Sequence, residues 1–287
     1  MYTDKHGNTW FKGNLHMHTT DSDGAMSPED AIALYRENGY DFVAVTDHRQ
    51  FCPPRDAEGI LVLSGGEYNT GITPAEGLVH IVGVGMTEDP KGSTEDSPQV
   101  LIDKVHRAGG VAIWAHPAWS LNAPDFIEKY EGIDATEIYN SVSGFPRNVR
   151  PDSSLITDML AMRGKPLKLA ATDDTHFYER ETCKSYIWVK AESCTREAIL
   201  DAIRAGDFYA SQGPQIEAFR EGDTITVETT PAASIAFFSD TVWVEDRVHI
   251  EDGVTKAIYT IGEKDTFVRA EVIDADGNKA WTQYFVV

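Results

Sequence analysis

Hydrophobic and polar positions follow two different patterns along this chain. From about residue 12 to residue 210, short apolar runs alternate with longer segments whose apolar residues recur at helical spacing. The apolar runs are rich in β-branched and aromatic residues, which favours strands buried on both faces, as in parallel sheets. They lie at residues 42–46, 60–63, 78–84, 110–115, 134–139, 167–171 and 185–189.

Three of the intervening segments carry clear helix signals. Residues 27–39, 97–110 and 195–207 each begin with a serine or threonine that can cap a helix. In the first two segments a proline follows at the first helical position and a glycine ends the helix. Strands that alternate with helices in this way indicate an α/β barrel or an open doubly wound sheet.

The pattern changes after residues 208–214. Short strand signals then follow one another without a clear helix between them, and residues 274–280 are typical of a hairpin turn. We therefore expect two domains, an α/β domain at 1–213 and a small all-β, sandwich-like domain at 214–287.

The composition limits the function classes. The chain has 287 residues, of which 41% are hydrophobic and 25% charged, as in an ordinary globular protein. It has no apolar run of about 18 residues and no basic-then-apolar start, so we expect neither a membrane span nor a secretory signal. Three cysteines without CxxC spacing favour a reducing compartment, and we expect a cytoplasmic protein.

The charge narrows the choice of partner. The formal net charge is −21, and an acidic surface repels nucleic acid and anionic membranes. A small-molecule substrate is therefore the expected partner, while the sequence does not indicate an oligomeric state.

Histidines gather where the strand signals end. Of the nine histidines, six lie in or just beyond such signals: His16, His18, His48, His80, His116 and His176. Carboxylates accompany them, and in α/β barrels the carboxyl ends of the strands form one rim. Nitrogen and carboxylate donors without cysteine suit Zn, Mn or Fe. The donors exceed the shell of one ion, which predicts two or three divalent metal ions.

Six segments carry a family resemblance. In order they are "NLHMHTTDSDG", "VAVTDH", "GGEY", "LVHIVG", "WAHP" and "ATDDTH". They resemble the successive motifs of the PHP (polymerase and histidinol phosphatase) superfamily, over roughly residues 12–213. The chain looks most like the metallohydrolases of that superfamily that carry a C-terminal β domain. The resemblance implies a distorted seven-stranded β/α barrel with a metal cluster of two or three ions at its rim.

The resemblance also implies a ligand set. By motif, the expected metal ligands are His16, His18, Asp23, His48, Glu67, His80, His116, Asp174 and His176. Glu67 resembles the carboxylate that bridges two ions.

Several polar residues remain outside that set. Asp47 is expected to orient a ligand. Asp21 is expected to be a loop carboxylate. Asn140, Arg147 and Arg150 belong either to a solvated loop or to a substrate-binding site.

Such a centre predicts hydrolysis. Two ions that share Glu67 lower the pKa of a bound water, and His80 or His176 could protonate the leaving group. This chemistry suits a phosphoesterase that acts on a small phosphorylated molecule. It equally suits a hydrolase of carboxylic esters, carbamates or amides. A third possibility is a non-catalytic binding protein, in which the β domain recognises a carbohydrate or a protein.

Overall fold

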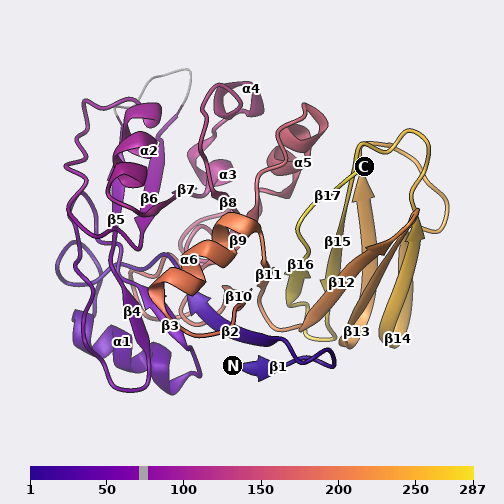
Figure 1. The fold of residues 1–287 in the computed structure, drawn as a ribbon, viewed down its shortest axis with the longest axis horizontal. Coiled ribbons are helices and arrows are strands. Elements are labelled where there is room, and N and C mark those ends of the chain that lie inside the picture. Colours follow the sequence, from indigo (N-terminus) through magenta and orange to yellow (C-terminus); the bar gives the residue numbers. More distant parts are fainter. Residues whose placement is uncertain (71–76) are drawn as a thin grey trace.

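The computed structural model describes residues 1–70 and 77–287, and their strands form two hydrogen-bonded sheets (Figure 1). The smaller sheet has the order β5-β6-β7-β8-β9, with β5 at Gly65–Asn69, β6 at His80–Val84, β7 at Val111–Trp114, β8 at Ala135–Asn140 and β9 at Leu169–Thr172. The larger sheet contains the run β11-β10-β2-β3-β4, with β2 at Thr9–Asn14, β3 at Phe42–Ala44, β4 at Leu61–Leu63, β10 at Tyr186–Lys190 and β11 at Phe208–Ser211.

The two sheets meet at two places. The chain runs from β4 into β5 through Ser64. Beyond the ends of β2 and β9, Met17 and Thr175 form an isolated parallel bridge, in which the His18 amide donates to the Thr175 carbonyl at 2.9 Å. The fold is therefore a mixed α/β arrangement. The closed barrel of seven strands is not confirmed, because the regular ladder is interrupted at both places.

The seven apolar runs all contain strands, namely β3, β4, β6, β7, β8, β9 and β10. Their expected parallel pairing is found in β2-β3-β4 and in β7-β8-β9. It is wrong for β6, which is antiparallel to β5 and β7, and for β10, which is antiparallel to β2 and β11. Strand burial depends on what covers the sheet and not on strand direction, so apolar runs could not distinguish these cases.

The three expected helices are confirmed as α1 (Pro28–Glu37), α2 (Pro98–Arg107) and α6 (Arg196–Ala205). Ser27, Ser97 and Thr195 cap them by accepting a backbone N–H three residues later. The structure adds α3 (Pro117–Ser120), α4 (Pro124–Ile127) and α5 (Ser154–Met162). Among the described residues, no helix has the length and apolar character needed to cross a membrane.

After β11 the described chain contains strands and no helix, as expected. These strands are β12 (Ile216–Glu221), β13 (Thr224–Ser239), β14 (Val248–Thr260), β15 (Phe267–Ile273), β16 (Lys279–Trp281) and β17 (Phe285–Val286), and β1 (Tyr2–Thr3) pairs with β2 at the other end of the chain. Strand β16 pairs with both β15 and β11, so these strands extend the larger sheet (Figure 1). The boundary at 213/214 stays a prediction.

A buried ion pair fastens the C-terminal strands to α5. The side chain of Arg269 on β15 is fully buried, and its Nε and Nη2 donate to the two carboxylate oxygens of Asp158 at 2.6 and 2.7 Å. The hydroxyl of Tyr284 donates to the same carboxylate at 2.8 Å. Strand β12 also contacts the N-terminal segment, where His6 Nε2 lies 2.7 Å from Glu217 Oε1.

Candidate metal centre

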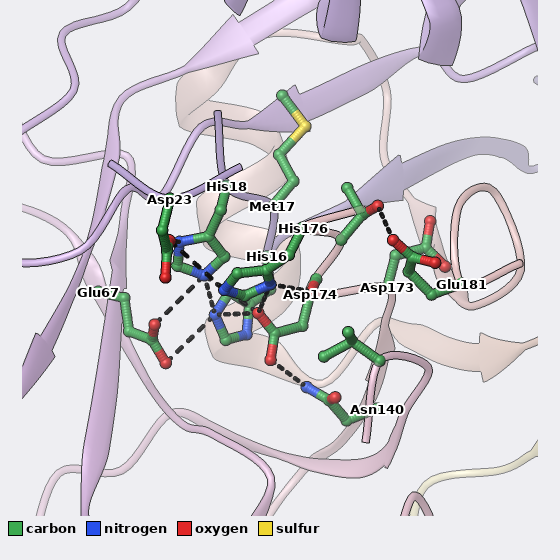
Figure 2. A network of polar contacts seen from close by, with 12 residues as sticks. His16, Met17, His18, Asp23, Glu67, Asn140, Asp173, Asp174, His176 and Glu181 are labelled. Carbon is green, nitrogen blue, oxygen red and sulfur yellow. Dashed lines mark hydrogen bonds and ion pairs between the residues drawn. The ribbon is translucent and has the colours of Figure 1, made fainter. Parts of the chain in front are cut away.

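The strand ends bring all nine expected ligands into one cluster, part of which Figure 2 shows. Five of the six histidines follow β2, β3, β7 or β9. His80 instead opens β6. Because β6 runs antiparallel to its neighbours, its first residue lies at the rim where the neighbouring strand β7 ends. The sequence did not predict that β6 is antiparallel. This direction explains why His80, at the start of its strand, lies beside histidines that follow the ends of theirs.

Glu67 lies at the middle of the cluster and is 1% exposed. Its carboxylate oxygens are 2.8 Å from His48 Nδ1 and 2.5 Å from His80 Nδ1. Nε2 atoms of three further histidines lie at 3.3 Å, namely His16, His18 and His116. Burial alone would raise the pKa of Glu67, but the surrounding imidazoles hold it well below its ordinary value. One ionised carboxylate therefore faces five imidazole rings.

Two further carboxylates complete the cluster. Asp174 Oδ1 lies 3.2 Å from His16 Nε2 and 3.0 Å from His18 Nε2 (Figure 2). Asp23 is half exposed, and its oxygens lie 3.6 Å from Nε2 of both His48 and His176. Asp174 thus belongs to the buried side of the cluster, and Asp23 to its solvent side.

The donor atoms fit metal ions. Buried His18 Nδ1, Glu67 Oε2 and Asp174 Oδ1 make no hydrogen bond, although nitrogen or oxygen atoms of other ligands lie near them. A buried polar atom without a partner costs about 1–3 kcal/mol, so several in one place call for a cation. Donor atoms within 4.8 Å of one another form three overlapping groups: His18, Asp23, His48, His176; His16, His18, Glu67, Asp174; and His48, Glu67, His80.

The far side of three rings is anchored. His16 Nδ1 lies 2.7 Å from a Glu137 oxygen, His116 Nδ1 lies 2.9 Å from Ser120 Oγ, and His176 Nδ1 lies 2.8 Å from the Asp174 carbonyl. A proton on each Nδ1 would leave Nε2 with a free lone pair that faces the cluster, which is how metal-ligating histidines are usually oriented.

Glu137 is a functional residue that the sequence reasoning missed. It lies inside β8 with no exposed surface. Its Oε1 faces His16 Nδ1 and accepts the Thr172 hydroxyl at 2.6 Å, while Oε2 accepts the His116 amide at 2.8 Å and the Asn140 side-chain amide at 2.7 Å. An acid inside a strand that is otherwise buried was the available signal, since a buried carboxylate needs a partner.

The carboxylates dominate the electrostatics of the histidine pair. Burial lowers the pKa of His16, but Asp174, Glu67 and Glu137 outweigh it and raise that pKa well above its ordinary value. By the same balance the pKa of His18 rises to about 9. The cluster therefore favours positive charge at its centre, whether as protons or as metal ions.

Two backbone features shape this site. His116 and Asp174 have positive φ angles of 29° and 50°, a conformation that costs about 1–3 kcal/mol per residue and persists only where the surrounding structure imposes it. At Gly24, a Cβ would lie 2.3 Å from the His18 carbonyl oxygen, so only glycine lets the turn after Asp23 pack against the ligand strand.

Two aspartates outside the ligand set, Asp47 and Asp21, bind residues of nearby loops. Asp47 accepts the Thr19 amide and hydroxyl at 2.7 Å each and the Ser22 hydroxyl at 2.6 Å, which fixes the turn between His18 and Asp23. Asp21 pairs with Arg55 at the surface.

Asp173 accepts three backbone amides of residues 183–185, and burial raises its pKa to about 6. It therefore closes the loop that follows His176.

The expected substrate contacts have other neighbours. Asn140 is buried, and its amide donates to Glu137 and, at 3.1 Å, to Asp174 (Figure 2). Arg147 is exposed and pairs with Glu179 at 3.0 Å. Arg150 is exposed. None of the three lines the cavity described below, and substrate binding by them stays a prediction.

A cavity of about 250 Å³ opens beside the cluster. One wall consists of seven of the nine ligands: Asp23, His48, Glu67, His80, His116, Asp174 and His176. The other wall consists of Trp119, Val142, Ser143, Asn148 and Phe177. A small molecule in this cavity would contact the ligands on one side and a largely apolar surface on the other.

Two known proteins are similar in sequence to parts of this chain. No family model matches the chain. It is 31% identical over 124 residues to the uncharacterized protein MJ1587 of Methanocaldococcus jannaschii, a match that covers 37% of this chain and 67% of that protein. A segment of 40 residues is 48% identical to the DNA polymerase/3'-5' exonuclease PolX of Bacillus subtilis, but it covers 14% of this chain and 7% of the polymerase.

A solved structure matches the whole chain. It is a two-domain protein from Bacteroides vulgatus that contains a predicted PHP-like metal-dependent phosphoesterase. The match has a TM-score of 0.59 and 17% identity, and it covers 100% of this chain and 97% of the other. Fold and site together define a mixed α/β protein with a histidine and carboxylate cluster at the strand ends. The chain thus shares its fold with a protein that contains a predicted PHP-like domain.

Proposed function

We propose that this protein is a metal-dependent hydrolase and that its substrate is a small phosphate ester. The observation that carries the proposal is the set of buried donor atoms without hydrogen bonds around Glu67 and Asp174. Two or three divalent ions (Zn, Mn or Fe) would lower the pKa of a bound water and polarise the oxygen that gains charge. The PHP-like phosphoesterase in the Bacteroides vulgatus protein supports the choice of phosphate.

The position of each residue in the cluster indicates the role that it would have. Glu67, with five imidazoles around it, is placed to bridge two ions. Asp23 and His176 lie on the solvent side, where a further ion or the substrate would arrive. His80 and His176 both line the cavity and are the candidates for moving a proton to the leaving group.

A carboxylic ester is the second candidate, and one observation favours it. The described residues that line the cavity include no lysine or arginine, so only the ions would neutralise an anionic substrate. The net charge of −21 adds a long-range repulsion for anions.

The first experiment combines metal content with substrate choice. Purified protein should hold at least two transition-metal ions per chain. With added Mn it should hydrolyse an aryl phosphate faster than an aryl acetate. A protein that never exceeds about one ion per chain would remove the cluster model. Faster acetate hydrolysis would favour the second candidate, and no turnover of either ester would favour a binding protein.

Glu67→Ala should abolish turnover while the fold persists, because the two sides of the centre lose their shared carboxylate. His106→Ala is the matched control, because His106 lies on α2 and pairs with Asp134 away from the cluster. Circular dichroism and steady-state kinetics of both variants make the measurement. Equal loss of activity in two folded variants would contradict the assignment of Glu67.

Inorganic phosphate provides a test that needs no turnover. Titration calorimetry should detect phosphate binding to the metal-loaded protein and none to the metal-stripped protein, because the stripped cluster is rich in carboxylates. Equal affinity of the two forms would place the anion site elsewhere.

A further inference from the structure

Two aromatic rings flank the candidate centre. The Trp119 ring lies 4.9 Å from the His116 ring and 6.4 Å from the His80 ring, between centroids. On another side, the Phe177 ring lies 6.3 Å from the His176 ring. Both aromatic side chains line the cavity together with the expected ligands. A group attached to a molecule held at the centre would therefore lie between or against these rings.

The rings do not belong to the hydrophobic core. Trp114, a core residue on β7, has no exposed surface, whereas Phe177 is 42% exposed and Trp119 is half-buried. Core packing alone does not account for a large apolar surface that borders a cavity next to buried charges. Exposed aromatic surface beside convergent polar groups is typical of a small-molecule site.

One loop fixes both rings through adjacent residues. Asn148 Oδ1 accepts the Trp119 indole N–H at 3.0 Å. The Arg147 guanidinium lies 4.0 Å over the centre of the Phe177 ring and also pairs with Glu179. The same loop contributes Val142 and Ser143 to the cavity wall. The rings are thus held in place by specific contacts, and preorganised rings bind a flat partner with less loss of conformational entropy.

The charges of the wall indicate what the rings would bind. Arg147 lies outside the cavity lining, where it contacts Phe177 and Glu179, and no arginine or lysine lines the cavity among the described residues. Nothing on this wall would neutralise a second anionic group. The part of the substrate that lies here should therefore be uncharged, and aromatic rings prefer flat π-systems in stacked or edge-to-face contact.

We propose that Trp119 and Phe177 form a subsite for an uncharged aromatic group of the substrate, next to the bond that is hydrolysed. This inference rests on the proposed function, since it names the substrate class of the same site. Arg147 and Asn148 act as positioning residues that hold the two rings.

Turnover of a matched pair of esters tests the subsite. Benzyl phosphate and ethyl phosphate release alcohols of similar acidity, so their ratio of kcat/KM reports recognition and not leaving-group chemistry. The ratio should be about ten or more in the parent protein, the factor expected for one good aromatic contact. Trp119→Leu and Phe177→Leu should each bring the ratio toward one, and Asn148→Ala should lower it by less. Trp243→Leu, at a residue that is 78% exposed in the loop between β13 and β14, should keep it.

Binding separates this inference from the proposed function. Calorimetry with benzylphosphonate and ethylphosphonate, which are not hydrolysed, should show about tenfold tighter binding of the benzyl compound to the metal-loaded protein. This preference should be lost in Trp119→Leu protein with unchanged metal content. If neither ester turns over but the preference is found, the subsite stands and the phosphoesterase is wrong. If esters turn over with a ratio near one, the subsite is wrong and the hydrolase stands. Equal affinity, no binding, or a preference unchanged in both ring variants also overturns the subsite.

Discussion

Glu137 joins four parts of the candidate centre through one carboxylate. It faces His16, holds the His116 backbone and accepts from Thr172 and Asn140. A carboxylate can accept from all four donors. A glutamine of the same size cannot, because its NH₂ group would face two of them.

Glu137→Gln should therefore lower metal affinity by about 10–100-fold, the usual effect of removing the partner that orients a ligating histidine. The measurement is competitive metal titration against a chelating dye. Glu192→Gln, at an exposed position in the described chain, should bind metal like the parent. If both variants keep the parent affinity, Glu137 serves packing alone.

At the scale of single residues, the sequence predicted most of the cluster. Residues of the metal-binding type stood where strand signals ended, and the structure brings all nine together. Glu137 was not predicted, because it lies within an apolar run and not after one. Asn140 was recognised as a polar residue near the site, but its direction depends on how β8 and β9 pair, which no local pattern encodes.

At the scale of elements, a second buried acid besides Asp173 holds the loop that follows β9. Glu181 Oε1 accepts the Phe177 and Tyr178 amides at 2.7 and 2.8 Å and the Thr175 hydroxyl at 3.0 Å. Burial raises the pKa of Glu181, but these donors outweigh it and lower that pKa below the ordinary 4.5. This loop carries His176 and one of the two aromatic rings.

A lowered pKa in the folded state means that Glu181 stabilises the fold above about pH 4.5 and that this contribution is lost as pH falls further. Glu181→Gln should reduce the free energy of unfolding by about 2 kcal/mol at pH 7. The difference between variant and parent should shrink as the pH falls below the ordinary pKa of 4.5.

Urea unfolding of metal-free protein at several pH values measures this difference. Glu88→Gln, at an exposed position, provides the baseline. A difference that stays constant from neutral to acid pH would show that the charge of Glu181 contributes nothing.

Strands β2 and β5 were missed for the same reason. Strands β2 and β5 contain lysine, asparagine and paired glycines, so they lack the apolar runs that marked the other strands. At Gly66, a Cβ would lie 2.3 Å from the Gln50 carbonyl oxygen, so close packing of β5 against the loop after β3 excludes a side chain. The glycines that allow β5 to place Glu67 in the centre thus also remove the apolar pattern by which this strand could have been predicted.

At the scale of the whole molecule, the ion pair of Arg269 and Asp158 ties the C-terminal strands to α5. Removing one partner of a buried pair leaves an uncompensated charge, so Asp158→Ala should lower the free energy of unfolding by about 3–5 kcal/mol. The double variant Asp158→Leu with Arg269→Met should recover most of that loss, because no charge is left behind.

Thermal and urea unfolding of the two variants tests the pair. Asp201→Ala removes one partner of an exposed pair with Arg204 and should change stability by about 0.5 kcal/mol or less. If the double variant is no more stable than Asp158→Ala, shape and not charge accounts for the loss.

The change of pattern after residue 213 predicted where helices end, but not how the last strands attach. Pairing of β16 with β11 joins residues about 70 positions apart, and the contact between Arg269 and Asp158 spans more. Such long-range pairing depends on the assembled surfaces of both partners, and a local window of sequence contains only one of them.

The position of β2 bears on how the protein matures during synthesis. This strand begins at residue 9 and pairs with β3 and also with β10, which begins at residue 186. The segment with His16 and His18 therefore leaves the ribosome well before its second neighbour, β10, is made. Pairings between distant segments form slowly and leave edges open meanwhile. During that interval the two histidines are available to metal ions without the other ligands. We therefore expect the metal supply that a nascent chain meets to influence how the proposed centre is loaded.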